Sequence, residues 1–298
     1  RFVLTEGDGG TSPNYDTTGT VSAVNDAPTD LSLSANTVAE NAANGTVVGI
    51  VTGTDPDTGD TQSYSLTDTA GGRFAINAST GEITVADGTL LDYESATSHS
   101  VTVRVTDAGG LMYDETFTIN LTNVNEAPTD LVLSASTVAE NAANGTVVGT
   151  VSGTDPDSGD TKSYSFTDSA GGRFAINSVT GELTVADGTL LDYESAGSHS
   201  VTVRVTDSGG LTYDETFTIN LTNVNEAPTD LALSSNTVAE NAADGTVVGM
   251  VSGTDPDSGD TKTYSFTDSA GGRFAINAST GELTVADGTL LDYESAGS

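Results

Sequence analysis

Short runs in which apolar and polar residues alternate make up most of the chain, and this period of two predicts β-strands. The alternation is clearest at Val101, Val103 and Val105, which polar residues separate, so one face of that strand is apolar. Turn-forming pairs such as Asn44-Gly45 and Gly109-Gly110 lie between the runs. Up to residue 121, strands are predicted over residues 31–33, 46–51, 62–66, 73–76, 82–85, 101–105 and 117–121.

Helical periodicity is almost absent, and the pattern allows only one helical turn, near residues 90–94. Seven short strands within about a hundred residues are typical of a Greek-key β-sandwich of the immunoglobulin-like kind. The predicted fold class is therefore all-β.

The sequence repeats itself with a period of 100 residues, because the stretch that begins at Asn125 begins again at Asn225. A hundred residues is enough for an independent domain, so the chain is expected to be an extended array of tandem seven-stranded sandwiches. The expected domains are the C-terminal strands of a preceding repeat at 1–26, complete repeats at 27–126 and 127–226, and a third repeat at 227–298 that ends before its last two strands.

Charge narrows the function classes. Acidic residues number 43 against 8 basic ones, and the net charge of −35 excludes a general binder of nucleic acids or anionic membranes. The sequence has no Cys, which excludes disulfides and thiolate metal sites, and no apolar run approaches the length of a membrane helix. A soluble, acidic, β-rich array of this kind is suited to binding a cation.

Four acidic elements recur in fixed order in each complete repeat. In the first they contain Glu40, the Asp55-Pro56-Asp57 turn, the Asp92-Tyr93-Glu94 stretch and Asp107. Each element alone has an ordinary structural explanation: a turn, a solvated loop, the cap of a short helical turn or the start of a hairpin. Together they suggest calcium, which takes about six to eight oxygen ligands. An EF-hand is excluded, because its twelfth position would fall on Leu66 instead of Glu.

In this combination and order the motifs resemble cadherin repeats. The stretches 73–77 and 80–83 are similar to the cadherin core, and the linker Asn123-Val124-Asn125-Glu126-Ala127-Pro128 is similar to the cadherin linker. The linker departs from the family's usual Asp-x-Asn-Asp, since Asn123 replaces one carboxylate and Glu126 is longer. The composition resembles that of cadherin-like domains in large bacterial surface adhesins.

The resemblance implies Ca²⁺ at the junctions between successive repeats. At the first complete junction the implied ligands come from the upstream repeat, the linker and the downstream repeat: Glu40, Asp92, Glu94, Asn123, Asn125, Glu126, Asp155, Asp157 and Asp207.

The other junctions are implied in part. The second has Glu140, Asp192, Glu194, Asn223, Asn225, Glu226, Asp255 and Asp257. The leading junction has Asn25, Asp26, Asp55, Asp57 and Asp107. A trailing set comprises Glu240, Asp292 and Glu294.

Other polar residues are expected to be structural. His99 and His199 are predicted on a strand surface, and Arg73, Arg173 and Arg273 in salt bridges. No Ser/His/Asp or Cys/His arrangement recurs, so no enzyme is expected.

The function expected from the resemblance is that of a calcium-stiffened structural and adhesion segment at a bacterial cell surface or outside the cell. Its partners would be other surface proteins, homophilic contacts included, or a polysaccharide, through domains that could lie outside these residues. The alternative is a calcium-dependent carbohydrate-binding module.

Overall fold

A computed structural model describes residues 22–294 of the chain, so most of the strand pair predicted at 1–26 lies outside the described residues. The chain divides into two compact units, Arg1–Glu126 and Ala127–Ser298. The first unit contains the first complete repeat, and the second unit contains the next two. Within the described residues, no helix is both long enough and apolar enough to cross a membrane.

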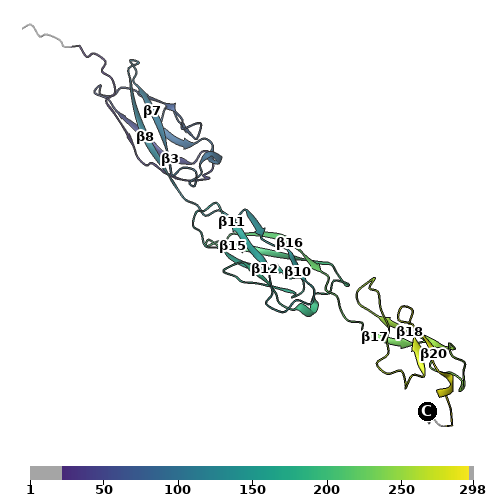
Figure 1. The fold of residues 1–298 in the computed structure, drawn as a ribbon. Coiled ribbons are helices and arrows are strands. Elements are labelled where there is room, and N and C mark those ends of the chain that lie inside the picture. Colours follow the sequence, from purple (N-terminus) through teal and green to yellow (C-terminus); the bar gives the residue numbers. More distant parts are fainter. Residues whose placement is uncertain (1–21, 295–298) are drawn as a thin grey trace, which may run out of the picture. The chain divides into compact units, whose positions relative to one another are not determined.

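All described secondary structure is β-strand, apart from one short 3₁₀ turn in each repeat (Figure 1). The first repeat contains β1 Asp30–Leu33, β2 Thr37–Ala39, β3 Val47–Thr54, β4 Ser63–Asp68, β5 Phe74–Ile76, β6 Glu82–Val85, η1 Gly88–Leu90, β7 Ser98–Thr106 and β8 Met112–Thr122. The second contains β9 Asp130–Leu133, β10 Thr137–Ala139, β11 Val147–Thr154, β12 Ser163–Asp168, β13 Phe174–Ile176, β14 Glu182–Val185, η2 Gly188–Leu190, β15 Ser198–Thr206 and β16 Thr212–Thr222. The third contains β17 Asp230–Leu233, β18 Val247–Thr254, β19 Phe274–Ile276, β20 Glu282–Val285 and η3 Gly288–Leu290.

Each complete repeat is a sandwich of two four-stranded sheets, which confirms the predicted fold class. In the first repeat the strand orders are β1-β3-β6-β5 and β2-β8-β7-β4, and the second repeat has the same arrangement. Neighbouring strands are antiparallel except for β2 with β8 and β10 with β16, which are parallel.

A short segment that the sequence pattern does not predict, β2, follows β1, so each complete repeat has one strand segment more than the pattern indicates. Segment β1 pairs with β3 in one sheet, and β2 pairs with β8 in the other. The crossing at Ala35 passes so close to β3 that a Cβ on Gly49 would lie 2.3 Å from the Ala35 carbonyl oxygen. Only glycine at position 49 therefore allows the first strand to change sheets.

The two sheets meet in an apolar core that follows the predicted alternation. Val101, Val103 and Val105 of β7 are fully buried, and so is Ile119 of β8. They pack in one cluster with residues of the facing sheet, including Phe74. The 3₁₀ turn begins at Gly88, slightly before the predicted helical turn, because the Asp87 side chain accepts a hydrogen bond from Thr89 N and caps it.

The third repeat has only the sheet β17-β18-β20-β19 among its described residues. The described residues include no second sheet in this repeat, so the apolar face of the sheet is uncovered. Leu231 is 68% exposed, whereas its equivalent Leu31 is 3% exposed. We therefore expect the third repeat of this chain to be the least stable.

Two structural roles differ from those predicted. Arg73 does not form the predicted salt bridge: its Nε donates to Leu90 O at 2.9 Å and its NH1 group to Ala70 O at 2.8 Å. His99 is half-buried in β7, not on the strand surface, and its Nε2 is buried without a hydrogen-bond partner. Burial, and secondarily the charge of Arg73, lower the pKa of His99. His199 has the same environment.

Acidification should destabilise the complete repeats through these histidines. Their pKa is lower in the folded chain than the ordinary value of about 6.5, so below that pH the unfolded chain binds more protons than the folded chain. Stability should be fully present above about pH 6.5 and fall as the pH drops towards the folded pKa. Thermal unfolding in chelator should show a smaller decrease between about pH 7 and about pH 5.5 for His99→Gln with His199→Gln than for wild type. An equal decrease in both proteins would contradict the assignment.

Removing a core aromatic ring should cost more stability in a complete repeat than in the third repeat. Phe74 is 1% exposed, so Phe74→Ala should destabilise its repeat by about 3–5 kcal/mol. The equivalent Phe274 is less buried, so Phe274→Ala should cost less. Calorimetric unfolding of the two variants measures the difference, and equal losses would show that the third repeat is packed as well as the first.

Candidate metal centre

The end of each complete repeat where the chain leaves it is organised by a buried glutamate. Glu40 is 2% exposed and directly follows β2. Its Oε2 accepts from Tyr93 N at 2.6 Å, and its Oε1 accepts from Val124 N at 2.8 Å. Glu140 binds the equivalent backbone groups, with both distances at 2.7 Å. One carboxylate therefore ties the acidic turn to the linker.

The acidic turn after η1 brings further carboxylates to the same end. Asp92 Oδ1 accepts from Ser95 N at 2.9 Å and its Oδ2 from Ser95 Oγ at 2.7 Å. These hydrogen bonds, that of the hydroxyl first, lower the pKa of Asp92, so the group stays ionised at neutral pH. Oxygen atoms of Glu40, Asp92 and Glu94 lie within 4.8 Å of one another.

The end where the chain enters a repeat carries a second group of carboxylates. Asp26 N donates to Asp57 Oδ2 at 2.7 Å, and Asn25 Nδ2 donates to Asp107 Oδ2 at 2.9 Å. Asp107 is 5% exposed, and its Oδ1 accepts from Leu111 N at 2.8 Å. Burial alone would raise the pKa of Asp107, but the hydrogen bonds from Asn25 and the following backbone lower it overall.

Asp60 joins this second group, although the sequence did not identify it as a site residue. Oxygen atoms of Asp55, Asp60 and Asp107 lie within 4.8 Å of one another, and Asp155, Asp160 and Asp207 form the same group in the second repeat. Asp60 Oδ2 also accepts from Ala108 N at 3.2 Å, which holds it beside the Asp107 loop. The sequence signal that could have identified Asp60 was its position directly after a glycine in the acidic turn. In the structure Gly59 has a φ of 88°, which turns the chain back.

The second group contains carboxylate oxygens that protein groups do not satisfy. Oδ2 of Asp55 and Oδ2 of Asp155 are buried without a hydrogen-bond partner. Desolvation raises the pKa of Asp155, while Lys162 opposes that shift and Asp160 adds to it. An unsatisfied buried carboxylate oxygen among other carboxylates suits a bound cation, and an all-oxygen donor set suits calcium.

Part of the second predicted junction is assembled within unit Ala127–Ser298. Oxygen atoms of Glu140, Glu194 and Glu226 lie within 4.8 Å of one another. Glu226 N also donates to Asp257 Oδ2 at 2.5 Å, and Asp257 is 5% exposed. Desolvation, together with the charges of Glu140, Asp257 and Glu226, raises the pKa of Glu194. These acidic groups therefore repel one another when no cation is bound.

The remaining predicted ligands are placed as follows. Asn123 and Asn223 are exposed and directly follow β8 and β16. Asn125 Nδ2 donates to Glu126 O at 3.4 Å, and Asn225 Nδ2 donates to Glu226 O at 3.0 Å. The predicted ligands of the first complete junction come from both compact units. Their assembly around one group of ions therefore stays a prediction.

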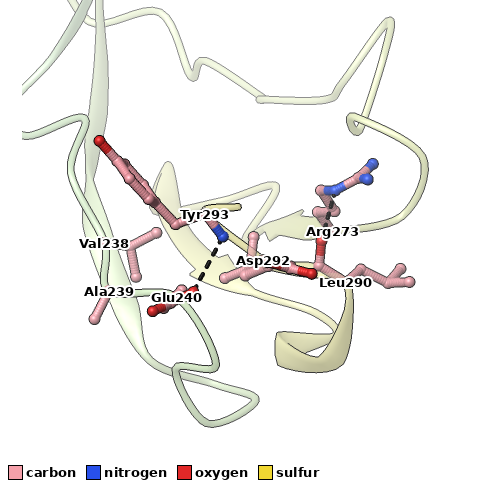
Figure 2. A pocket seen from close by; sticks show the side chains of 8 residues that line it. Val238, Ala239, Glu240, Arg273, Leu290, Asp292 and Tyr293 are labelled. Atoms are coloured by element: carbon pink, nitrogen blue, oxygen red, sulfur yellow. Dashed lines mark hydrogen bonds between the residues drawn. The ribbon is translucent and has the colours of Figure 1, made fainter. Parts of the chain in front are cut away.

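Two residues of the trailing set, Glu240 and Asp292, line a cleft of about 160 Å³ in the third repeat (Figure 2). Oxygen atoms of Glu240, Asp292 and Glu294 lie within 4.8 Å of one another, but all three residues are exposed. Glu240 keeps the hydrogen bond from Tyr293 N, at 3.1 Å. The acidic group therefore forms without the buried setting that Glu40 and Glu140 have.

The fold and the carboxylate groups together place the chain among proteins built from tandem β-sandwich repeats that carry acidic residues at the ends of each repeat. The family model described as the cadherin domain matches residues 35–122, 134–222 and 234–298. The chain belongs to the cadherin family, whose members are structural adhesion proteins that generally bind calcium between repeats.

Curated relatives extend the match to animal adhesion proteins. The chain is 33% identical over 278 residues to protocadherin-like wing polarity protein stan of Drosophila melanogaster, covering 87% of this chain and 8% of the relative. It is 29% identical over 278 residues to human protocadherin Fat 1, covering 89% of this chain and 6% of the relative. The chain thus spans less than a tenth of these relatives, and they give no support to the bacterial origin expected from composition.

A solved structure supports the fold over most of the chain. The crystal structure of mouse cadherin-23 EC22-24 is 27% identical, with a TM-score of 0.66 and coverage of 85% of each chain. Protocadherin gamma B2 extracellular cadherin domains 1-5 is 22% identical with a TM-score of 0.62, a similarity that shows the fold alone.

Calcium should raise the unfolding temperature of the chain, because an ion that binds only the folded state stabilises it by mass action. Magnesium should have a smaller effect, since it is smaller and loses water reluctantly. Calorimetric scans in chelator, calcium and magnesium at equal ionic strength make the comparison. Identical transitions in chelator and in millimolar calcium would contradict a calcium centre in these carboxylate groups.

Proposed function

We propose that the chain is a calcium-stiffened segment of a cell-surface or extracellular adhesion protein, with calcium bound at the junctions between its repeats. The observation that carries the proposal is the group of Glu140, Glu194 and Glu226, with Asp257 bonded to Glu226 N. These residues come from the end of one repeat, the linker and the start of the next. A cation among them would share ligands with all three parts.

The stiffening follows from electrostatics. The chain carries a net charge of −35, and its carboxylates gather at the repeat ends. Without a cation, like charges on either side of a linker favour separation of the repeats. A divalent cation reverses the sign of this interaction and fixes the angle between the repeats. The ligands proposed for this role are those identified in the sequence at the junctions, with Asp60 and Asp160 supporting the entry side.

The proposed role is structural, so the adhesive partner would bind through surfaces or domains that this segment holds at a distance. The carbohydrate-binding alternative receives no support from the family or from the residues at the repeat ends.

Small-angle scattering tests the stiffening directly. Calcium should narrow the distribution of distances between repeats and lengthen the maximum dimension relative to chelator. Asp155→Asn with Asp157→Asn should abolish the change at the first complete junction, because it removes two predicted ligands on the entry side of the second repeat.

The matched control is Glu82→Gln with Glu182→Gln, which removes the same number of charges from strand positions that pair with Ile50 and Thr150 and are not predicted ligands. This control should respond to calcium like the wild type, and circular dichroism should confirm that both variants are folded. Wild-type scattering that is the same in calcium and in chelator would overturn the stiffening mechanism.

A further inference from the structure

The residue that follows each buried glutamate makes a contact that the proposed calcium ligation does not explain. Asn41 Nδ2 donates to Glu126 Oε1 at 2.8 Å, and Asn141 Nδ2 donates to Glu226 Oε1 at 2.7 Å. In each pair the asparagine lies after the second strand of its repeat and the glutamate lies in the linker, 85 positions later. Because the same contact occurs in both complete repeats, it is a regular feature of the way the linker is held.

The backbone at these asparagines restricts which residue fits. Asn41 and Asn141 have φ angles of 53° and 52°, in the left-handed region where asparagine is favoured among non-glycine residues. The backbone nitrogen of Asn41 also donates to Leu91 O at 3.1 Å. The backbone of Asn41 is therefore fixed where its side-chain amide can reach the Glu126 carboxylate.

The hydrogen bond from Asn141 holds the carboxylate of the linker residue Glu226 near the buried carboxylate of Glu140. Glu140 and Asn141 are adjacent, so one backbone segment holds Val224 N through Glu140 and the Glu226 carboxylate through Asn141. Glu226 N is held at the same time by Asp257 Oδ2. The linker residue is thus held by its side chain from the upstream repeat and by its backbone from the downstream repeat.

The chemistry of the donor matters. A lysine or arginine in this place would hold the carboxylate but neutralise it and compete with a cation. An amide donates a hydrogen bond without adding charge, so the carboxylate is oriented while its charge remains available.

We propose that Asn41 and Asn141 are positioning residues that orient the linker glutamates, Glu126 and Glu226, for calcium. The inference rests on the proposed calcium function of the junctions. Without the amide, the long Glu side chain must be ordered when the ion binds, so calcium affinity is lower.

The test is calcium titration by calorimetry with the whole chain. Asn41→Gly and Asn141→Gly keep the left-handed backbone and remove only the amide. Each should weaken calcium binding at its own junction by about three- to tenfold, in line with the cost of ordering one long side chain when the ion binds. The matched control is Asn241→Gly: Asn241 has a φ of 54°, but the described residues of its repeat include no linker glutamate for it to orient, so calcium binding should not change.

A double-mutant cycle separates positioning from a general structural effect. In a Glu226→Gln background, Asn141→Gly should cause no further loss of calcium affinity, because the carboxylate that it orients is absent. Unfolding temperatures in chelator should differ less between wild type and Asn141→Gly than those in calcium.

The failures are distinguishable. A wild-type chain that binds no calcium overturns the proposed function. A wild type that binds calcium, with Asn41→Gly and Asn141→Gly binding it as tightly, overturns the positioning role alone. Equal losses in Asn141→Gly and Asn241→Gly, or equal losses with and without Glu226→Gln, also overturn it.

Discussion

The buried glutamate at the end of the second strand is the interaction on which the rest of each repeat end depends. A carboxylate that is 2% exposed is costly to bury unless its oxygens are hydrogen-bonded, and Glu40 meets this condition with Tyr93 N and Val124 N. Those backbone groups belong to the acidic turn and to the linker. The position of the other carboxylates thus follows from how one buried charge is satisfied, and the neighbouring Asn41 extends the same hold to Glu126.

The sequence was sufficient for the fold class because alternation and turn chemistry are local signals. The valines of β7 are buried as their spacing predicts, and the Gly-containing turns lie between strands. The separate segment β2, and the change of sheet before it, could not be foreseen from periodicity. The change of sheet depends on Ala35 approaching Gly49, a tertiary contact that the spacing of apolar residues does not indicate. The same limit applies to Arg73, whose partners are the carbonyl oxygens of Ala70 and Leu90, which a search for opposite charges does not find.

The candidate site shows the same division between local and non-local information. Motif order identified Glu40, Asp92 and Glu94, which the structure brings within 4.8 Å of one another. Asp60 was passed over because an Asp after a turn glycine is ordinary in a loop. Its relation to Asp107 arises from a contact with Ala108 N across 48 residues. His99 illustrates the opposite error, since its neighbours in sequence indicate a surface strand while burial from the facing elements leaves Nε2 unsatisfied.

The parallel pairing of β2 with β8 has a mechanical consequence. The pair is bracketed by Asn120 N to Asn36 O at 2.8 Å and by Glu40 N to Thr122 O at 3.1 Å. Tension along the chain would enter a repeat before β1 and leave through the linker after β8, pulling β2 and β8 in opposite directions along their length. The hydrogen bonds between them would then be loaded together in shear instead of being opened one after another. In single-molecule stretching, the two complete repeats should accordingly yield at higher force than the third, whose described residues contain no such pair.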